Sequence, residues 1–366
     1  MLTRICLGGF KTFSQPVELD LCSLNVLIGA NGAGKSNLIS FFRLLNFLST
    51  GALQEWIGRA GGASSLLSYG SEETQQIRAS LRFESSEGTN SYDIRLSWAA
   101  PDTLIFVEER VGFHRKGKGY VKPQEIHLGA GHKESSLIGS ELPPAKFVLS
   151  QLHRCKVYQF HDTSGMARVR KPSYLEDNQY LRDNAGNLAA VLFRLGQKET
   201  GYYQRIVGVV RQIFPRFHDF DLAPSALNER TVLLNWTESG SPYLFGPHQL
   251  SDGTLRAIAL ITLLLLPDSM LPDLILLDEP ELGLHPYALT ILAGLVQAVT
   301  TRRQVLISTQ SATLIDHFKP EDIVTVDRTG RDSALRRQEP DRLREWLADY
   351  SISELWEKNV LGGRPA

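Results

Sequence analysis

Apolar residues near the N-terminus fall in short runs that are typical of β-strands. The pattern predicts strands over residues 2–7, 17–21 and 24–28, and the last of these is apolar enough to be a buried strand. A glycine-rich segment follows at residues 29–34. Beyond it, apolar residues recur at helical spacing over residues 37–48. The segment therefore predicts a strand, a glycine loop and a helix in direct succession.

The central part of the chain has a different pattern. Residues 51–150 are rich in glycine and serine and carry short alternating segments at 77–83 and 92–96, which predict a β-rich insertion with mobile loops. Residues 174–214 show helical periodicity, and strand-like pieces return around residues 232–236.

From residue 250 onward, helices and strands alternate. The pattern predicts helices over 251–266, 286–300 and 311–318, and strands over 274–278, 304–308 and 322–327. Alternation of this kind is typical of a parallel sheet covered by helices.

Composition and charge exclude several classes of protein. Of 366 residues 42% are hydrophobic, which is ordinary for a globular chain. The chain has 39 Lys and Arg residues against 40 Asp and Glu residues, which gives a formal net charge of -1. No overall electrostatic attraction therefore draws the protein to nucleic acid or to a membrane surface. Three scattered cysteines argue against a disulfide framework or a zinc site. The longest apolar stretch, residues 257–266, is far short of the about 20 residues that span a bilayer, and no export signal begins the chain. We therefore expect a cytoplasmic protein without membrane contact.

A phosphate-binding loop is predicted between the first buried strand and its helix. Residues 29–36 read Gly-Ala-Asn-Gly-Ala-Gly-Lys-Ser, which fits the P-loop pattern at every position. In that pattern, backbone N–H groups and a helix N-terminus surround the phosphates, Lys35 reaches the β- and γ-phosphates, and Ser36 binds Mg²⁺. The alternative, a glycine-rich turn that happens to carry Lys-Ser, fits the flanking strand and helix less well. The residues expected to contact ATP here are Asn31, Gly32, Ala33, Gly34, Lys35, Ser36 and Asn37.

A second acidic element ends the predicted strand at residues 274–278. The strand would deliver Asp278 to the metal ion, and Glu279 would activate the attacking water as a general base. Successive side chains of a strand point in different directions, so the two carboxylates can serve different partners. An acidic strand end alone is common. In combination with the phosphate loop it indicates hydrolysis of ATP with Mg²⁺.

Together these motifs resemble the ATP-binding-cassette ATPases. The resemblance rests on the phosphate loop, on Leu-Ser-Asp-Gly-Thr at residues 250–254, and on the Asp-Glu-Pro element. The phosphate loop, the segment 157–164 and the run Asp-Glu-Pro-Glu-Leu-Gly-Leu-His-Pro at 278–286 are similar to the RecF-like and SMC-like branch, including ATPases of the overcoming-lysogenization-defect type. The resemblance covers most of the chain and is weakest over residues 85–150.

The resemblance implies an α/β fold, a P-loop NTPase head of the ABC type with an N-terminal antiparallel β portion and an inserted helical lobe. We expect an N-terminal ATPase lobe over residues 1–170 with the β-rich insertion at about 51–150, and a helical lobe with a strand connection over 171–249. A C-terminal ATPase lobe over 250–366 would hold the signature, the acidic strand and a switch strand.

The resemblance also implies a homodimer, or a higher oligomer, that closes around two ATP molecules. Ser251 and Gly253 would then contact the γ-phosphate bound by the opposite subunit, because a helix N-terminus with a small hydroxyl and a glycine is an anion site. The alternative is a plain N-cap of a buried helix. Asp252 departs from the glycine usual at that position of the motif.

Gln310 stands where cassette ATPases usually carry a switch histidine. A glutamine can hydrogen-bond the γ-phosphate or the water but cannot take a proton, so Gln310 would position and sense while Glu279 acts as the base. A polar cap at a strand end is the alternative. Gln159 and His161 are candidates for a loop that senses metal and phosphate, although a buried structural histidine is the simpler interpretation, and His285 is either an interface residue or a helix start.

Two short basic clusters could grip phosphates, although a solvated loop is the simpler interpretation of the first. Their members are Arg110, Arg115, Lys116, Lys118 and Lys122 with interleaved Phe113 and Tyr120, and then Arg154, Lys156, Arg168, Arg170 and Lys171.

Two absences limit the function. Between Ser36 and Ser251 the sequence has no sustained heptad repeat, so long coiled-coil arms are not expected. The residues that follow Gln310 are too few for an appended nuclease domain. We therefore expect a head whose nucleotide state controls a separate effector protein, as in an antiphage system. The alternative is a DNA-recombination or repair factor that clamps DNA between its heads, as RecF does. A transporter cassette is disfavoured by the residues at 278–286.

Overall fold

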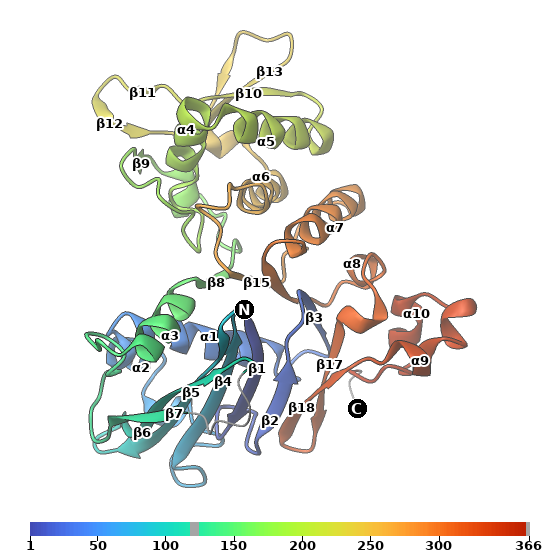
Figure 1. Ribbon diagram of the computed structural model, residues 1–366. Helices are drawn as coiled ribbons and strands as arrows, with labels where there is room; N and C mark the ends of the chain where they lie inside the picture. Colours follow the sequence, from blue (N-terminus) through green and yellow to red (C-terminus); the bar gives the residue numbers. More distant parts are fainter. Residues whose placement is uncertain (118–123, 364–366) are drawn as a thin grey trace.

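Two six-stranded sheets form the lower part of the molecule, and a lobe of helices and short strands stands above them (Figure 1). The computed structural model describes residues 1–117 and 124–363. Together the sheets and the lobe give the mixed α/β fold of a P-loop head, as the sequence predicts.

The first sheet is antiparallel and has the order β2-β1-β4-β5-β6-β7. Its strands are β1 (Leu2–Gly8), β2 (Val17–Asp20), β4 (Gln76–Glu84), β5 (Gly88–Ala99), β6 (Thr103–Arg115) and β7 (Gln124–Gly129). Burial alternates along β4, as it does in a strand with one buried face. Because β4 pairs with β1, the predicted β-rich segment extends the N-terminal sheet. That segment also contains two helices that the pattern does not predict, α2 (Leu53–Arg59) and α3 (Pro143–His153).

The second sheet has the order β18-β17-β3-β16-β15-β8, and only its edge strand β18 runs antiparallel. Its strands are β3 (Leu24–Ile28), β8 (Cys155–Tyr158), β15 (Leu274–Asp278), β16 (Gln304–Ser308), β17 (Ile323–Thr329) and β18 (Asp332–Arg337). Every residue of β3, β15 and β16 is buried, which explains why these strands were readable as continuous apolar runs.

Helices cover both faces of the parallel sheet. Helix α1 (Lys35–Ser49) packs on one face, and one apolar core joins it to the antiparallel sheet. Helix α7 (Pro286–Thr300) packs on the other face, in a core that continues into the upper lobe. The sheets are also joined by the buried side chain of Gln304, whose Oε1 accepts from the Leu2 N–H at 3.0 Å and whose Nε2 donates to the Leu2 carbonyl at 2.8 Å.

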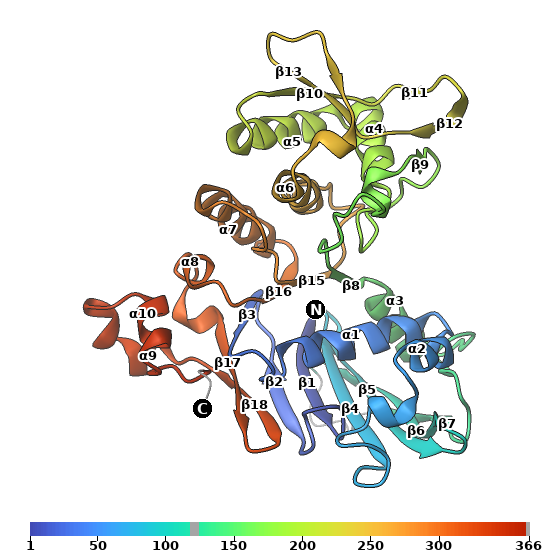
Figure 2. The same cartoon turned by 180° about the vertical axis from the view of Figure 1, so that it is seen from behind.

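The upper lobe is built around three helices, α4 (Leu188–Lys198), α5 (Thr200–Ile213) and α6 (Asp252–Leu264) (Figure 2). Two small sheets flank them, with strands β9 (Ser173–Tyr174), β10 (Phe217–Asp221), β11 (Pro224–Ser225), β12 (Asn228–Val232), β13 (Asn235–Glu238) and β14 (Leu244–Phe245).

The predicted helical start at residue 174 is wrong, because α4 begins only at Leu188. The preceding segment is held in an irregular path by the buried Asn187 side chain. Its Nδ2 donates to the carbonyls of Asp177 and Tyr180, and its Oδ1 accepts from a backbone N–H of the same segment. A side chain that satisfies backbone groups in this way replaces the hydrogen bonds of a helix.

The C-terminal part adds short elements beside the parallel sheet: α8 (Ala312–Ile315), α9 (Pro340–Leu343) and α10 (Ile352–Glu357). Single 3-10 turns occur at Ala63–Ser65, Arg168–Arg170, Pro247–Gln249, Pro320–Asp322 and Trp346–Ala348. Within residues 1–117 and 124–363, no helix combines the length and the apolar character needed to cross a membrane.

Candidate nucleotide-binding site

The predicted motifs meet at one edge of the parallel sheet. Strands β3, β16 and β15 are neighbours and run in the same direction, with Asp278 opposite Ser308 in the register. Their carboxyl ends therefore lie together, which is where open α/β sheets bind ligands. The glycine loop follows β3, Glu279 follows β15, and Gln310 lies just beyond β16.

The glycine loop leads directly into α1. Gly34 is the N-cap residue with a φ of 122°, and no side chain caps the helix. A Cβ at Gly34 would overlap the Ser333 hydroxyl, so the loop requires glycine there. Asn31, Gly32 and Ser36 are exposed, whereas Ala33 is buried. The free N–H groups of a helix start and an open loop provide a binding site for phosphate oxygens.

Lys35 is buried within this loop. Its Nζ donates to the carbonyl oxygens of Gly29 at 2.5 Å and of Ala30 at 3.1 Å. Burial lowers the pKa of Lys35, and the nearby carboxylate of Glu279 opposes that shift. Asn37, the last residue predicted to contact ATP, has its side-chain amide directed to the Thr12 hydroxyl at 2.8 Å.

Asp278 carries an unsatisfied buried oxygen. Asp278 is only 8% exposed, and its Oδ1 has no hydrogen-bond partner among the described residues. Burial raises the pKa of Asp278, the Ser308 hydroxyl opposes that shift, and the neighbouring charge of Glu279 adds to it. An unpaired buried carboxylate is costly unless a cation neutralises it. A carboxylate oxygen and the exposed Ser36 hydroxyl are hard oxygen ligands, so the residues present fit Mg²⁺.

The loop after β8 lies against Asp278. Gln159 Nε2 is 3.3 Å from Asp278 Oδ2 and 3.0 Å from His161 Nδ1, and His161 Nε2 is 2.9 Å from the Asp278 carbonyl oxygen. Arg43 of α1 in turn donates to Gln159 Oε1. The structure therefore places both candidate sensing residues beside the acidic strand end.

Glu279 and Gln310 are in direct contact. Gln310 Nε2 donates to Glu279 Oε1 at 2.8 Å. The Glu279 backbone has a φ of 45°, in the left-handed region that non-glycine residues rarely adopt, and its N–H donates to the Ser308 carbonyl at 2.8 Å. Backbone strain of this kind concentrates at functional sites because the surrounding structure must stabilise it.

Glu281 is a further candidate site residue, which the sequence motifs do not single out. Its Oε1 accepts from the Thr309 hydroxyl at 2.6 Å and from the Gln310 N–H at 3.0 Å, so it fixes the end of β16. Burial raises the pKa of Glu281. The sequence feature that could have identified Glu281 is its position as a third acidic residue directly after Asp-Glu-Pro.

The signature segment begins α6. Ser251 is the N-cap residue, and its Oγ accepts from the Thr254 N–H at 3.1 Å. Ser251 therefore acts as an N-cap within its own subunit. Because its side chain is also exposed, a second subunit could still reach it. A Cβ at Gly253 would overlap the Gly283 carbonyl oxygen, so the loop after β15 packs directly on the signature.

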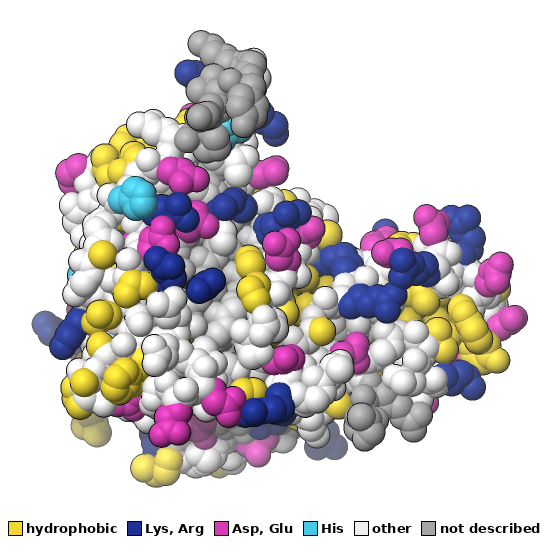
Figure 3. Space-filling model, turned by 90° about the horizontal axis from the view of Figure 1, so that it is seen from below, with side chains coloured by type: hydrophobic (Ala, Val, Ile, Leu, Met, Phe, Trp, Pro, Cys, Tyr) yellow, Lys and Arg dark blue, Asp and Glu magenta, His cyan; other side chains and the backbone are white. Residues whose placement is uncertain are grey.

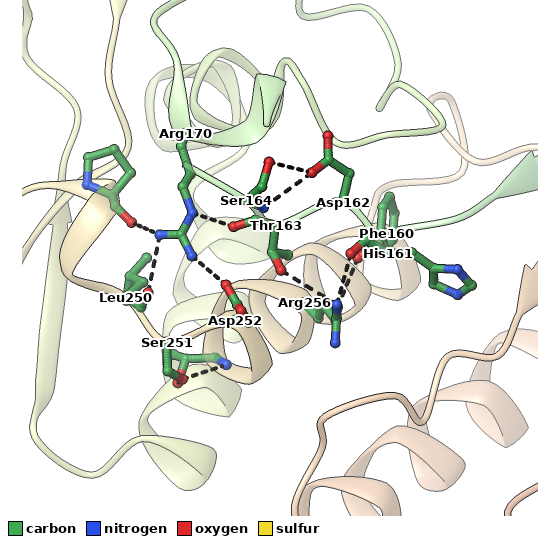
Figure 4. Close-up of polar contacts among 12 residues, drawn as sticks. Phe160, His161, Asp162, Thr163, Ser164, Arg170, Leu250, Ser251, Asp252 and Arg256 are labelled. Carbon is green, nitrogen blue, oxygen red and sulfur yellow. Dashed lines mark hydrogen bonds and ion pairs between the residues drawn. The ribbon is translucent and has the colours of Figure 1, made fainter. Parts of the chain in front are cut away.

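Two arginines connect the signature to the loop after β8 (Figure 4). Buried Arg170 donates to the carbonyls of Thr163 at 2.7 Å, Leu250 at 3.1 Å and Pro247, and pairs with Asp252 at 2.8 Å. The Thr163 hydroxyl and the Arg170 guanidinium lower the pKa of Asp252. Asp252 thus has a structural reason to replace the usual glycine.

Arg256, one turn further along α6, makes the second connection. Its guanidinium donates to the carbonyl oxygens of Phe160 at 3.1 Å, His161 at 2.8 Å and Leu282 at 3.1 Å. The loops that follow β8 and β15 are therefore both attached to the signature helix.

Three members of the second basic cluster have separate environments and do not act together. Arg154 pairs with Asp273, Arg170 is buried as described, and Lys156 lines a cavity. In the first cluster, Arg110 pairs with Glu108 and Glu125, and Lys118, Tyr120 and Lys122 lie outside the described residues. His285 is the N-cap of α7, accepting from the Tyr287 N–H.

Comparison with known proteins places these motifs in a family. Residues 24–316 match the protein family described as "AAA domain, putative AbiEii toxin, Type IV TA system". A 76-residue segment, 20% of this chain, is 40% identical to a Geobacter sulfurreducens protein named "Putative ABC transporter ATP-binding protein". That match covers 29% of the relative's length.

Three similar solved structures are SMC heads, at sequence identities that indicate a shared fold alone. The first, an SMC head bound to the C-winged helix domain of ScpA, is 15% identical, covers 94% of this chain and 99% of that one, and has a TM-score of 0.63. A Pyrococcus furiosus head with an extended coiled coil is 14% identical with coverages of 95% and 98% and a TM-score of 0.57. The Thermotoga maritima head is 14% identical with coverages of 92% and 99% and a TM-score of 0.50.

Replacement of Arg170 tests the connection between the signature and the loop after β8. Arg170→Ala leaves three carbonyl oxygens without their donor, so we expect the free energy of unfolding to fall by about 3 kcal/mol. Urea denaturation measures the change. Arg168→Ala, at an exposed position of the same turn, is the matched control and should change stability by less than about 0.5 kcal/mol. Equal losses in the two variants would contradict the connection.

Proposed function

We propose that this chain, which belongs to the AAA domain family of the AbiEii type and has the fold of an SMC head, hydrolyses ATP and uses it as a dimerisation switch. The observation that carries the proposal is the meeting, at one sheet edge, of the glycine loop, the unsatisfied Asp278 oxygen and the Glu279–Gln310 pair. Binding of ATP with Mg²⁺ is what a P-loop of this family implies.

Each residue has a distinct role in this proposal. The loop N–H groups and the Lys35 ammonium would hold the β- and γ-phosphates, and Ser36 with Asp278 would hold the Mg²⁺. Bound Mg²⁺ would neutralise the charge that develops on the phosphate oxygens. Glu279 takes a proton from the attacking water, and Gln310 orients that water and the Glu279 carboxylate through its amide. Gln310 cannot take the proton itself, so slow turnover is expected.

The signature would act in the opposite subunit. The exposed Ser251 and the N-terminus of α6 offer an anion site to a γ-phosphate held by the second subunit. Arg170 and Arg256 would transmit closure at this signature to the loop beside Asp278, because both arginines contact residues of the two segments.

A separate effector protein is the proposed partner, in a cytoplasmic defence system. The family description names a toxin of a toxin–antitoxin system, and two of the similar SMC heads are bound to a domain of ScpA. The alternative, a RecF-like clamp on DNA, needs a continuous basic surface. On the face shown in Figure 3, Lys and Arg side chains are interspersed with Asp and Glu side chains, so this face offers no continuous basic surface. Salt-dependent, ATP-dependent binding of labelled duplex DNA would favour the clamp.

Two substitutions at the site should separate binding from turnover. Lys35→Ala removes the ammonium that holds the phosphates, so ATP binding should weaken and hydrolysis should cease. Glu279→Gln keeps the site but removes the base, so ATP should bind while turnover falls at least about a hundredfold. Phosphate release and nucleotide titration measure the two effects, with exposed Lys198→Ala as the control. Hydrolysis at the wild-type rate in both variants would show the site assignment to be wrong.

Assembly should depend on ATP and on Ser251. In the Glu279→Gln background, ATP should shift the protein toward a closed dimer, and Ser251→Arg should prevent the shift because its bulk and charge occupy the γ-phosphate position. Light scattering reports the mass. Ser86→Arg places the same side chain on an exposed hairpin away from the signature and should leave the shift intact. If ATP leaves the mass of the Glu279→Gln protein unchanged, the proposed contact of Ser251 with a second subunit is contradicted, and only its N-cap role remains.

A further inference from the structure

A cavity of about 670 Å³ lies between the P-loop helix and the upper lobe. Helices α1 and α2 line one side, and β8 and residues 180–184 line the rest. Its lining includes Gln159 but neither Lys35 nor Asp278, so it is distinct from the phosphate loop. A volume of this size is typical of sites for small-molecule ligands.

The cavity wall carries four cationic side chains, Arg43, Arg59, Lys156 and Arg182, against one carboxylate, Asp183. Arg43 and Lys156 are partly buried in it, and in the described part of the chain neither forms an ion pair. Arg43 donates to the neutral Gln159, and burial lowers the pKa of Lys156 despite the nearby Asp183 carboxylate. Partly buried cations that form no ion pair are stabilised by an anionic ligand.

The rim adds two further cations that already have partners. Arg59 pairs with Glu55, and Arg182 pairs with Asp177 at 2.8 Å. The positive charge available to a ligand therefore comes mainly from Arg43 and Lys156.

Aromatic rings form a second part of the wall. The rings of Phe47 and Trp56 lie with centroids 6.4 Å apart, and the exposed Tyr180 stands at the rim. Flat apolar faces next to cations favour a ligand that combines a planar ring with a negative charge.

One hydrogen-bonded chain leads from this cavity to the nucleotide site. Arg43 donates to Gln159 Oε1, and Gln159 Nε2 reaches Asp278 Oδ2 at 3.3 Å. An anion that engages the Arg43 guanidinium would remove the donor that fixes the Gln159 amide. The contact between Gln159 and Asp278 would change with it.

We propose that this cavity binds a nucleoside monophosphate, a phosphate monoester attached to a planar ring, and that Arg43 and Gln159 transmit its binding to Asp278. The site goes beyond the proposed ATPase function, because its occupation requires no turnover of ATP. Coupling between two such sites is reciprocal, so nucleotide at the phosphate loop should also change the affinity of the cavity.

Calorimetric titration of the four ribonucleoside 5′-monophosphates tests the binding. The full chain carries Lys35→Ala, so that the phosphate loop does not compete. We expect at least one monophosphate to bind with a Kd below about 1 mM, and its nucleoside and ribose 5-phosphate to bind at least about tenfold more weakly. Lys156→Glu should weaken binding at least about tenfold, whereas Lys198→Glu, the same charge change at an exposed site, should not.

Three results would overturn the site: no binding by any of the four, binding that Lys156→Glu leaves intact, or equal loss in the Lys198→Glu control. The transmission has its own test in the chain without the Lys35 substitution. A saturating monophosphate should change the Kd for ADP with Mg²⁺ at least about fivefold, and Gln159→Leu should abolish this change while retaining monophosphate binding. An ADP affinity that the monophosphate leaves unchanged would overturn the transmission.

Discussion

The burial of the Asp278 carboxylate at the end of β15 is the constraint on which the site depends. A carboxylate in this position loses most of its hydration, and one of its oxygens receives no hydrogen bond from the described residues. The surrounding groups compensate only in part, through the Ser308 hydroxyl, a long contact from Gln159 and nearby positive charge. The fold therefore maintains an electrostatic cost that a bound cation would relieve, which is how many functional sites trade stability for activity.

The same strand end organises its neighbours. Glu279 is held in a left-handed conformation directly after Asp278, and Glu281 fixes the backbone that carries Gln310. The loop after β8 meets Asp278 on one side and the signature helix on the other through Arg256. These segments share hydrogen bonds as well as proximity, so we expect a change in one of them to affect the others.

The sequence predicts the parallel sheet well, and it predicts which residues gather at one edge of that sheet, because both depend on local patterns. A buried strand is a run of apolar residues, and a phosphate loop is a contiguous motif whose glycines are required by backbone geometry, as at Gly34. The sequence fails where the determining contacts are distant. Arg170 binds carbonyl oxygens that no motif encodes, and its pairing with Asp252 joins residues far apart in the chain.

The same distinction explains the errors in secondary structure. The coil before α4 depends on the Asn187 side-chain amide, which donates to several backbone carbonyls at once. The segment therefore does not form a helix, although its apolar residues recur at helical spacing. The membership of β4 in the N-terminal sheet depends on pairing with β1, which periodicity cannot report. The roles of Lys35, Ser251 and Glu279 remain predictions that geometry supports and that activity must decide.

The central claim is that each ATP is enclosed by the phosphate loop of one subunit and the signature of the other. Mixing two inactive variants, Lys35→Ala and Ser251→Arg, tests it directly through the rate of ATP hydrolysis. Mixed dimers contain one intact composite site, so random pairing in a two-fold dimer should restore about a quarter of the wild-type rate. A mixture of exchanging subunits that stays as inactive as its components would contradict the account.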